Sequence, residues 1–218
     1  MKQKFVRPTI AISHADQAGG AMREIDGWAI ELKKYAENLR YNVIDISGPD
    51  LTYERMPEIL ATTKPAALFN FSYGRKTCLM GNPIDGMTKC TLTQGDGMPS
   101  NLSVLSGIAV VSYSSFTGGE LGERMIKAGC PALVGFKDLF MFVSDGAKTL
   151  DVFKKSLLIL SERVLRGFPI GEAIERASCD LSKEVVKYKD LKHVSLPLLH
   201  DMRSLTLLGD ADWGLEPP

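Results

Sequence analysis

The chain has 218 residues, of which 44% are hydrophobic and 24% charged, and its formal net charge is zero. This balance is typical of a globular protein and argues against a nucleic-acid or anionic-membrane partner. No apolar run reaches the ~18 residues of a membrane span. The basic start, Met1–Phe5, is followed by no apolar core of the kind found in a signal peptide. We therefore expect no membrane association.

The cysteines and histidines show no metal-binding or redox spacing. Cys78, Cys90, Cys130 and Cys179 are dispersed and form no Cys-x-x-Cys pair. In a chain of this size, such spacing favours reduced thiols in a cytoplasmic protein over a disulfide framework. The three histidines are also far apart, so no zinc pattern is present. The sequence predicts no metal and no cofactor.

The first part of the chain alternates between strand and helix patterns. Thr9–Ser13 is a predicted strand, and His14 opens the polar, glycine-containing loop after it. Met22–Leu39 carries apolar residues at spacings of three and four, which predicts a helix with one face in a core. A second strand is expected at Asn42–Ile46 and a third at Ala66–Phe71.

A second helix is expected between these last two strands. It begins between Thr52 and Pro57, because proline is tolerated only in the first turn, and it ends before Lys64. Strands and helices that alternate through short connections predict right-handed crossovers and a parallel sheet. No Gly-x-Gly-x-x-Gly follows the first strand, so a dinucleotide-binding fold is not supported.

The segment from Ser72 to Ser100 is predicted to be one long irregular loop. It contains several glycines and shows no clear apolar period. Loops of this length in a compact domain are usually functional. Because it leaves the carboxyl end of the third strand, we expect it to lie beside the carboxyl ends of the neighbouring strands.

The stretch Ile108–Gly122 joins a buried strand to a helix start. Its apolar first half is typical of a strand covered on both faces. Thr117 is the predicted N-cap of the following helix, with Glu120 completing a capping box. Ser114 and Ser115 lie between, at the strand end, where open α/β sheets place ligands and nucleophiles. The alternative is that both serines only end the strand and help to cap the helix.

The rest of the chain continues the pattern without a linker or repeat, so residues 1–218 are predicted to form one domain. Gly129 is expected to be the C′ residue of the helix that begins at Gly118. The remaining elements are expected as a strand at Pro131–Gly135, helices at Lys148–Arg166 and Ile170–Val186, and a short edge strand at Leu205–Leu208.

Three short segments share a pattern with one known fold. Residues 68–74, with Gly81 following, have an apolar run that ends in an aromatic-glycine pair. Residues 110–115 lead through Leu121-Gly122 to a Gly-x-x-Ala-apolar-apolar-Gly-aromatic strand at 129–136. Residues 205–211 have a Leu-x-Leu-x-Gly-Asp ending. Together they resemble the caspase-like fold, closest to the gingipain-like and separase-related branch of the caspase clan of cysteine peptidases.

The resemblance implies an α/β three-layer sandwich, with a mostly parallel sheet in the order 2-1-3-4-5, the final strand at an edge and helices on both faces. It also implies where the catalytic dyad of the family would fall. The general-base histidine aligns with Tyr73, and the nucleophilic cysteine aligns with Ser115 or, with a one-residue shift, Ser114. Serine needs a strong base beside it, and tyrosine is a poor base at neutral pH. The chain therefore resembles a caspase-like protein without the peptidase chemistry.

The leading hypothesis is a degenerate peptidase domain, more likely not an enzyme, that binds a protein or peptide partner at the former substrate cleft. Tyr73 and Ser115 are expected at the carboxyl ends of adjacent strands, with their side chains close together. The oligomeric state stays open. The candidate binding residues around the dyad positions are His14, Gly74, Arg75, Lys76, Ser114, Gly118 and Gly119.

Two alternatives remain open. An active hydrolase would use Ser115 with Lys76 as base, if burial lowered the pKa of the lysine, or a displaced Cys78 or Cys90 with His14. A doubly wound protein of another family would bind an anion or a nucleotide at the glycine pair 118–119, where free N–H groups and the helix dipole favour negative charge.

Overall fold

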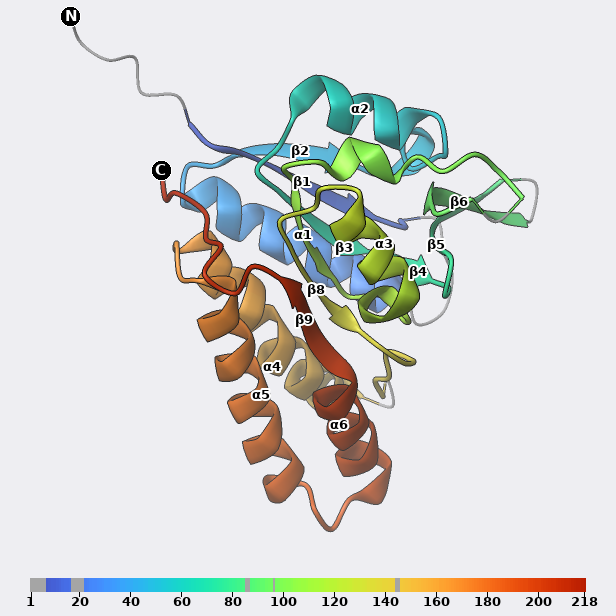
Figure 1. Ribbon diagram of the computed structural model, residues 1–218. Coiled ribbons are helices and arrows are strands. Elements are labelled where there is room, and N and C mark those ends of the chain that lie inside the picture. The colour runs from blue at the N-terminus through green and yellow to red at the C-terminus, as the bar shows by residue number, and fades with distance from the viewer. Residues whose placement is uncertain (1–6, 17–21, 85–86, 96, 144–145) are drawn as a thin grey trace, which may run out of the picture.

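The computed structural model describes residues 7–16, 22–84, 87–95, 97–143 and 146–218. Its frame is a six-stranded sheet in the order β2-β1-β3-β7-β8-β9 (Figure 1). All neighbouring pairs are parallel except β8 and β9. The predicted sheet order and the edge position of the last strand are confirmed. The strands are β1 (Thr9–His14), β2 (Asn42–Ile46), β3 (Ala67–Phe71), β7 (Ala109–Ser112), β8 (Ala132–Phe136) and β9 (Leu205–Gly209).

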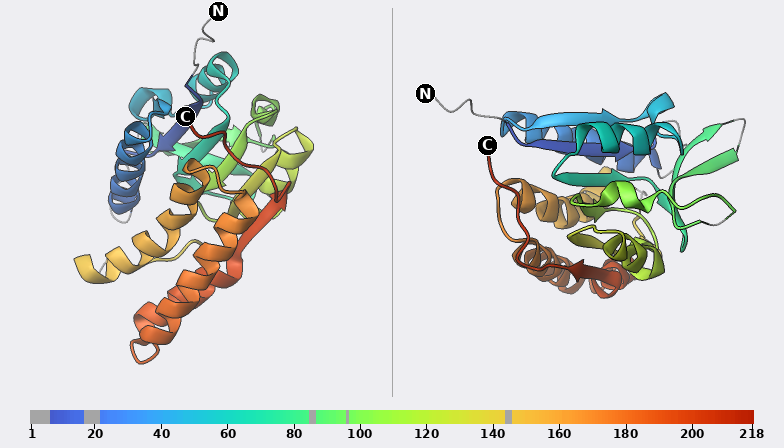
Figure 2. Two further views of the ribbon diagram at one scale, coloured as in Figure 1. Left: turned by 90° about the vertical axis from the view of Figure 1, so that its left-hand side faces the viewer. Right: turned by 45° about the horizontal axis from the view of Figure 1, so that its top comes forward.

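Helices cover both faces of this sheet, as Figure 2 shows. The chain moves outward from β1 to β2 and then back past β1 to β3, so right-handed crossovers place α1 and α2 on opposite faces. Helix α4 packs against both α1 and α5, while α3 packs against β8 and β9. The described helices are α1 (Met22–Asn38), α2 (Arg55–Thr63), α3 (Gly122–Lys127), α4 (Ala147–Leu165), α5 (Ile170–Lys187) and α6 (Lys192–Ser204).

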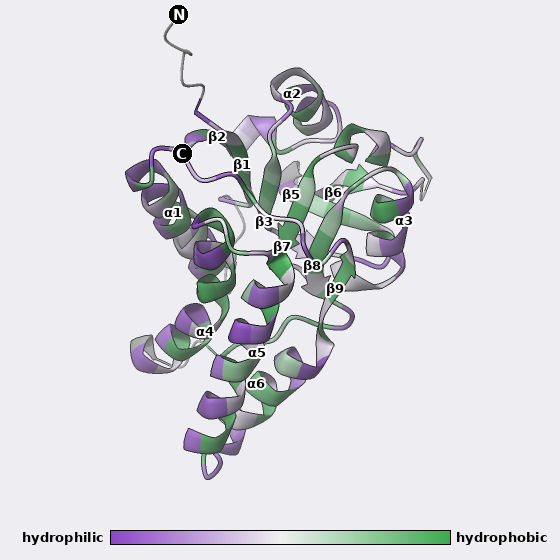
Figure 3. Cartoon of the chain, turned by 60° about the vertical axis from the view of Figure 1, so that its left-hand side comes forward, coloured by the Kyte–Doolittle hydropathy of each residue, from purple (hydrophilic) through white to green (hydrophobic). Residues whose placement is uncertain are grey.

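The core follows the apolar periods of the sequence. Strands β3 and β8 are buried at every position, as expected for strands covered on both faces. Of the apolar stripe expected on α4 at Leu150, Phe153, Leu157, Leu160 and Val164, the last four are buried and Leu150 is partly buried. Figure 3 shows apolar strands in the centre and helices with one hydrophilic side outside. No helix among the described residues is long and apolar enough to cross a membrane.

The segment predicted as one irregular loop instead forms a second, three-stranded sheet. It comprises β4 (Tyr73–Gly74), β5 (Cys78–Ile84) and β6 (Met87–Thr93), paired antiparallel in that order. The register of β5 and β6 shifts twice along the pairing. These irregularities, together with the glycine and proline inside β5, disrupt the period-two pattern by which a strand is recognised in a sequence.

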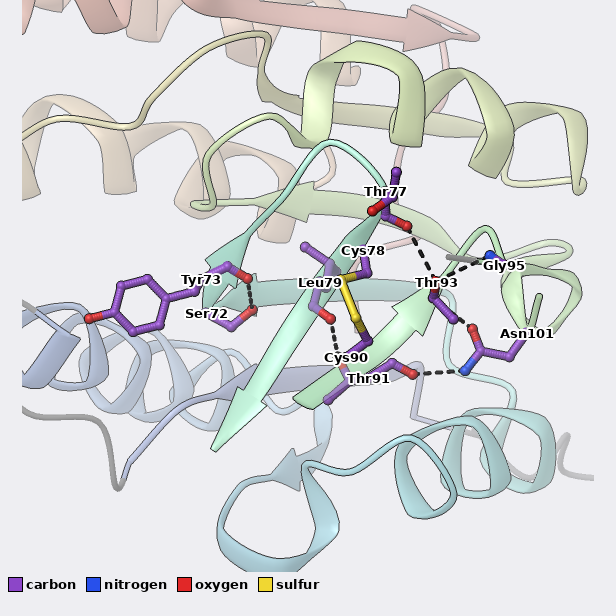
Figure 4. The surroundings of a disulfide bond; sticks show 10 residues. All are labelled: Ser72, Tyr73, Thr77, Cys78, Leu79, Cys90, Thr91, Thr93, Gly95 and Asn101. Atoms are coloured by element: carbon purple, nitrogen blue, oxygen red, sulfur yellow. Dashed lines mark hydrogen bonds between the residues drawn. A yellow bond between two sulfur atoms is a disulfide. The ribbon is translucent and has the colours of Figure 1, made fainter. Parts of the chain in front are cut away.

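A disulfide joins β5 to β6, between Cys78 and Cys90 (Figure 4). The expectation of four reduced thiols is therefore wrong. The two cysteines are separated by 12 positions in the sequence, and antiparallel pairing brings their Cα atoms to 5.8 Å. This is a normal separation for a disulfide. Cys130, which is buried, and Cys179, which is exposed, are free.

The helix start after β7 differs from the predicted capping box. Phe116 occupies the position before the first helical turn with φ of 62°, and no side chain caps that turn. Thr117 instead donates its hydroxyl to the Ser114 carbonyl at 3.0 Å and also bonds Ser112 Oγ. The other end is as predicted, because Gly129 follows α3 with φ of +101°.

Both ends of the described chain lie at the amino end of the central sheet. Arg7 and Pro8 line one cavity of about 410 Å³ together with Glu216 and Pro217. Backbone bonds from Ile170 and Gly171 on α5 hold the final segment in place at residues 211 and 213.

Candidate functional site

The carboxyl ends of β1, β3, β7 and β8, with the residues that follow them, are called the rim here. Beneath the rim, Asn70 organises a buried hydroxyl network. Its Nδ2 donates to Ser112 Oγ at 3.0 Å and to Ser114 Oγ at 2.7 Å. Its Oδ1 accepts from Ser13 Oγ at 2.9 Å and from Ser72 Oγ at 3.1 Å. All four bonding positions of the amide are thus filled, which fixes three adjacent strands in register.

Ser114 belongs to this network and is not an accessible nucleophile. Its side chain is buried, and its hydroxyl donates to the Ser72 carbonyl at 2.6 Å while accepting from Asn70. In the alignment shifted by one residue, the nucleophile position would fall on Ser114, and its hydroxyl has a structural role instead.

Ser115 is half-buried on the rim and makes a different contact. Its Oγ accepts a hydrogen bond from the Phe140 backbone N–H at 3.0 Å. Among the residues that the structure describes, no histidine, lysine or carboxylate is hydrogen-bonded to this oxygen. A serine hydroxyl without such a base is a weak nucleophile.

Tyr73 begins β4 and has a side chain that points into solvent. It is 44% exposed, and its phenol makes no hydrogen bond to another described residue. Figure 4 shows the ring directed away from the disulfide-linked strands. The next residue, Gly74, packs directly on the Ser115 carbonyl. The two expected dyad positions are thus neighbours on the rim through their backbones.

Arg75 and Lys76 follow in the turn between β4 and β5, and both are exposed. The Arg75 N–H donates to the Cys78 carbonyl at 2.8 Å, which closes that turn. A Ser–Lys arrangement required burial of the lysine, and Lys76 lacks it.

His14 lies at the carboxyl end of β1, as expected, but its side chain is bonded to carboxylates on α1 and β2 and not to the groups around Ser115. It is the last residue of β1, only 6% exposed, and its ring lies between Asp26 of α1 and Asp45 of β2, at 2.5 and 2.8 Å. Asp45 also pairs with Lys33 at 2.6 Å. Burial raises the pKa of Asp45, but hydrogen bonds from Lys33 and His14 outweigh it and leave that pKa below its usual range.

This placement removes the pairing of His14 with a displaced cysteine. Its two partners lie on the β2 side of β1, whereas Ser115 follows β7 on the other side. Both Cys78 and Cys90 are consumed in the disulfide. Cys130 is no substitute, because burial raises the pKa of its thiol to about 12.

The first residue of the glycine pair after β7, Gly118, is packed tightly. A Cβ on Gly118 would lie 2.5 Å from Thr206 and 2.8 Å from the Gly135 carbonyl oxygen. The N–H of Gly119 donates to the Phe116 carbonyl at 3.2 Å. Gly118 thus permits close packing of the helical turn against β8 and β9, whereas a Cβ on Gly119 would lie 3.7 Å from the Lys137 carbonyl oxygen, an ordinary contact.

The segment after β8 forms part of the rim, and the sequence indicated only that this segment is apolar. Residues 137–141 follow β8, and Phe140 stacks on Phe136 with ring centroids 4.7 Å apart. Beside them is a cavity of about 240 Å³ lined by Lys137, Asp138, His200, Arg203 and Ser204. No sequence signal joins 137 to 203, because the helix that supplies the second half, α6, was itself not predicted.

Asp201, on the buried side of α6, ties this helix to the rim. Its Oδ1 accepts from the Met141 N–H at 2.9 Å, and its Oδ2 is buried without a partner among the described groups. Burial raises the pKa of this carboxyl well above its usual value.

Comparison with known proteins adds a structural relative. No protein-family profile and no curated protein sequence matches the chain. The crystal structure of the Arg specific cysteine proteinase gingipain R (RGPB) superposes with a TM-score of 0.59 at 12% identity. The match covers 96% of this chain and 48% of the gingipain chain, so the chain spans about half the length of that relative. At this identity the likeness concerns the fold alone, and the chain has a caspase-like fold.

Proposed function

We propose that this chain is a catalytically degenerate caspase-like domain that binds a protein or peptide partner along the rim. The observation that carries the proposal is the bonding of Ser115. Its oxygen accepts the Phe140 N–H, and no base among the described residues contacts it. Tyr73, at the position of the expected histidine, is directed into solvent.

The fold supports the choice of surface. Gingipain R is an Arg specific cysteine proteinase, and this chain superposes on about half of it. Ligands of open α/β sheets bind at the carboxyl ends of the strands. Here that edge presents three exposed apolar side chains, Tyr73, Leu139 and Met141, at 44, 50 and 38% exposure. Exposed aromatic and methionine side chains are enriched in interfaces.

The cytoplasmic location expected from the cysteine spacing rested on four reduced thiols. The Cys78–Cys90 disulfide removes that basis, because persistent disulfides are rare in the reducing cytosol. We therefore place the proposed binding function in an oxidising compartment.

The absence of hydrolysis is tested with a fluorophosphonate probe on the full chain. We expect no labelling of Ser115, and no turnover of a peptide library, because the hydroxyl lacks a base. Labelling that Ser115→Ala abolishes would instead establish the active hydrolase.

Binding is tested with a fluorescent decapeptide library on the full chain. Tyr73→Ala and Leu139→Ala remove exposed rim side chains and are expected to lower the affinity for any peptide that the chain binds. Val186→Ala and Leu196→Ala, at 66 and 58% exposure near the far end of the α5–α6 hairpin, are the matched controls and are expected to leave binding unchanged. No retained peptide, or loss confined to the control variants, overturns the proposal.

A further inference from the structure

The segment 137–141, called the β8 loop here, is held on both sides by its own backbone. Three N–H groups donate to fixed acceptors: Lys137 to the Ser204 carbonyl at 2.8 Å, Phe140 to Ser115 Oγ at 3.0 Å, and Met141 to Asp201 Oδ1 at 2.9 Å. The loop thus joins α6 to the strand end at Ser115. A surface that is ordered before binding loses less entropy when a ligand arrives.

Positive charge collects in the cavity of about 240 Å³ between this loop and the last turn of α6. Lys137 and Arg203 line it, and neither forms an ion pair with a carboxylate of the described residues. Asp138 also lines it, with Oδ1 accepting from the Leu139 N–H at 2.8 Å. The two cations, Lys137 and Arg203, and the one carboxylate, Asp138, give the pocket a net charge of +1.

His200 forms part of the wall of this cavity. Its Nε2 lies 2.9 Å from the Leu139 carbonyl oxygen. A carbonyl oxygen only accepts, so Nε2 carries the hydrogen and donates. This bond fixes the ring at the wall of the cavity.

We propose that Lys137 and Arg203 in this pocket bind the carboxylate of an acidic side chain in a peptide that lies across Leu139 toward Ser115. The inference rests on the proposed rim-binding function and names the class of partner. The net charge of one matches a carboxylate better than a phosphate dianion, since Asp138 lines the same cavity. Leu139 and Met141 offer apolar contacts to the residues that flank the acid.

The test uses fluorescein-labelled acetyl-Ala-Leu-Xaa-Leu-Ala-amide on the full chain, with aspartate, asparagine or phosphoserine at Xaa. We expect the aspartate peptide to bind about tenfold more tightly than the asparagine peptide, the effect of one charge-assisted hydrogen bond. Lys137→Gln and Arg203→Gln are each expected to remove most of this difference and to leave the asparagine peptide unaffected. Added salt should reduce the difference in affinity between the aspartate and asparagine peptides, because Lys137 and Arg203 are exposed.

Lys189→Gln is the matched control, since this lysine follows α5 at the far end of the hairpin. It should leave all three affinities unchanged. Equal binding of the aspartate and asparagine peptides, weakened alike by Leu139→Ala, would overturn the acidic pocket while the rim-binding function stands. Tighter binding of phosphoserine would overturn the carboxylate assignment.

A further experiment with a free anion tests whether the pocket binds small anions without binding a peptide. Sodium acetate is titrated while the side-chain resonances of Arg203 are followed by NMR. Shifts of these resonances with no binding of the aspartate peptide would overturn the peptide assignment, because the pocket would then serve small free anions. Failure of every peptide in this series, when the decapeptide library still yields a rim-dependent ligand, overturns the inference as well.

Discussion

Gly74 and Ser115 are in direct backbone contact. A Cβ built on Gly74 would lie 2.0 Å from the Ser115 carbonyl oxygen and 3.1 Å from the Ser114 Cβ. The small sheet of β4, β5 and β6 is therefore seated on the central sheet at this point. The contact needs a glycine for space, since no side chain fits between the two segments.

Gly74→Ala is accordingly expected to destabilise the protein. The added methyl group must push β4 away from Ser115, an overpacking that typically costs about 1–3 kcal/mol. Urea unfolding followed by circular dichroism measures the change. Gly27→Ala is the control, because a Cβ there meets nothing within 4 Å and alanine favours the helix α1 by roughly 0.5–1 kcal/mol. Equal stability of the two variants would contradict the contact.

Asn70→Ala is predicted to be the more severe polar substitution. It removes the amide that bonds four hydroxyls beneath the rim and leaves buried donors and acceptors unpaired. On the order of 3 kcal/mol of unfolding free energy should be lost. Asn42→Ala removes only an exposed bond to Thr9 and should change it by less than about 0.5 kcal/mol. Similar denaturation midpoints for the two variants would count against the network.

The disulfide predicts a thiol count. Cells are quenched in acid, free thiols are alkylated under denaturing conditions, and the intact mass is recorded before and after reduction. Two alkylated cysteines are expected first, Cys130 and Cys179, and four after reduction. Four at the outset would contradict both the bond and the proposed oxidising compartment. Replacing Cys78 and Cys90 together by serine should cost about 3 kcal/mol, as expected for a short closed loop.

Asp201 predicts stability that falls as pH rises. Burial raises its pKa in the folded protein above the unfolded value, so between these two values the folded state holds more protons. The stability contribution of Asp201 is therefore fully present below the unfolded pKa and is lost as pH rises through the folded pKa. Asp201→Asn keeps an acceptor for the Met141 N–H and should stabilise the protein at pH 7 but not at pH 4.

Asp45 provides the comparison of opposite sign. Its pKa is lowered in the folded protein, so its contribution is present above the unfolded pKa and is lost as pH falls through the folded one. Asp45→Asn should therefore destabilise the protein at pH 7, and by progressively less as pH falls through the folded pKa of Asp45. Parallel pH profiles of unfolding for the two variants would refute the assigned directions.

The central sheet was predictable because its strands and covering helices follow simple apolar periods. The strand Asn42–Ile46 has the bounds expected from the sequence, and the stripe on α4 is buried from Phe153 to Val164. The second sheet was not predictable in this way. Its strands are short or shifted in register, and they are held by pairing, a disulfide and contact with Ser115 that no local pattern reveals.

The candidate site was likewise predictable only in part. Residues 74 and 115 meet on the rim because both follow neighbouring parallel strands, and strand order could be inferred. The orientation of His14 depends on Asp26 and Asp45, which lie 12 and 31 positions away. The basic pocket depends on α6, whose internal Pro197 disguises a helix in the sequence. Side-chain partners of this kind are settled by tertiary packing.

Because Pro8 and Pro217 line one cavity, a circularly permuted form of residues 8–217 can be designed. The two prolines lie together at the amino end of the sheet, so a short glycine-serine linker can join them. New termini opened in the turn between α5 and α6, at residues 188–191, would fall at the far end of the helical hairpin. A fluorescent label fused there would report on the molecule without covering the rim.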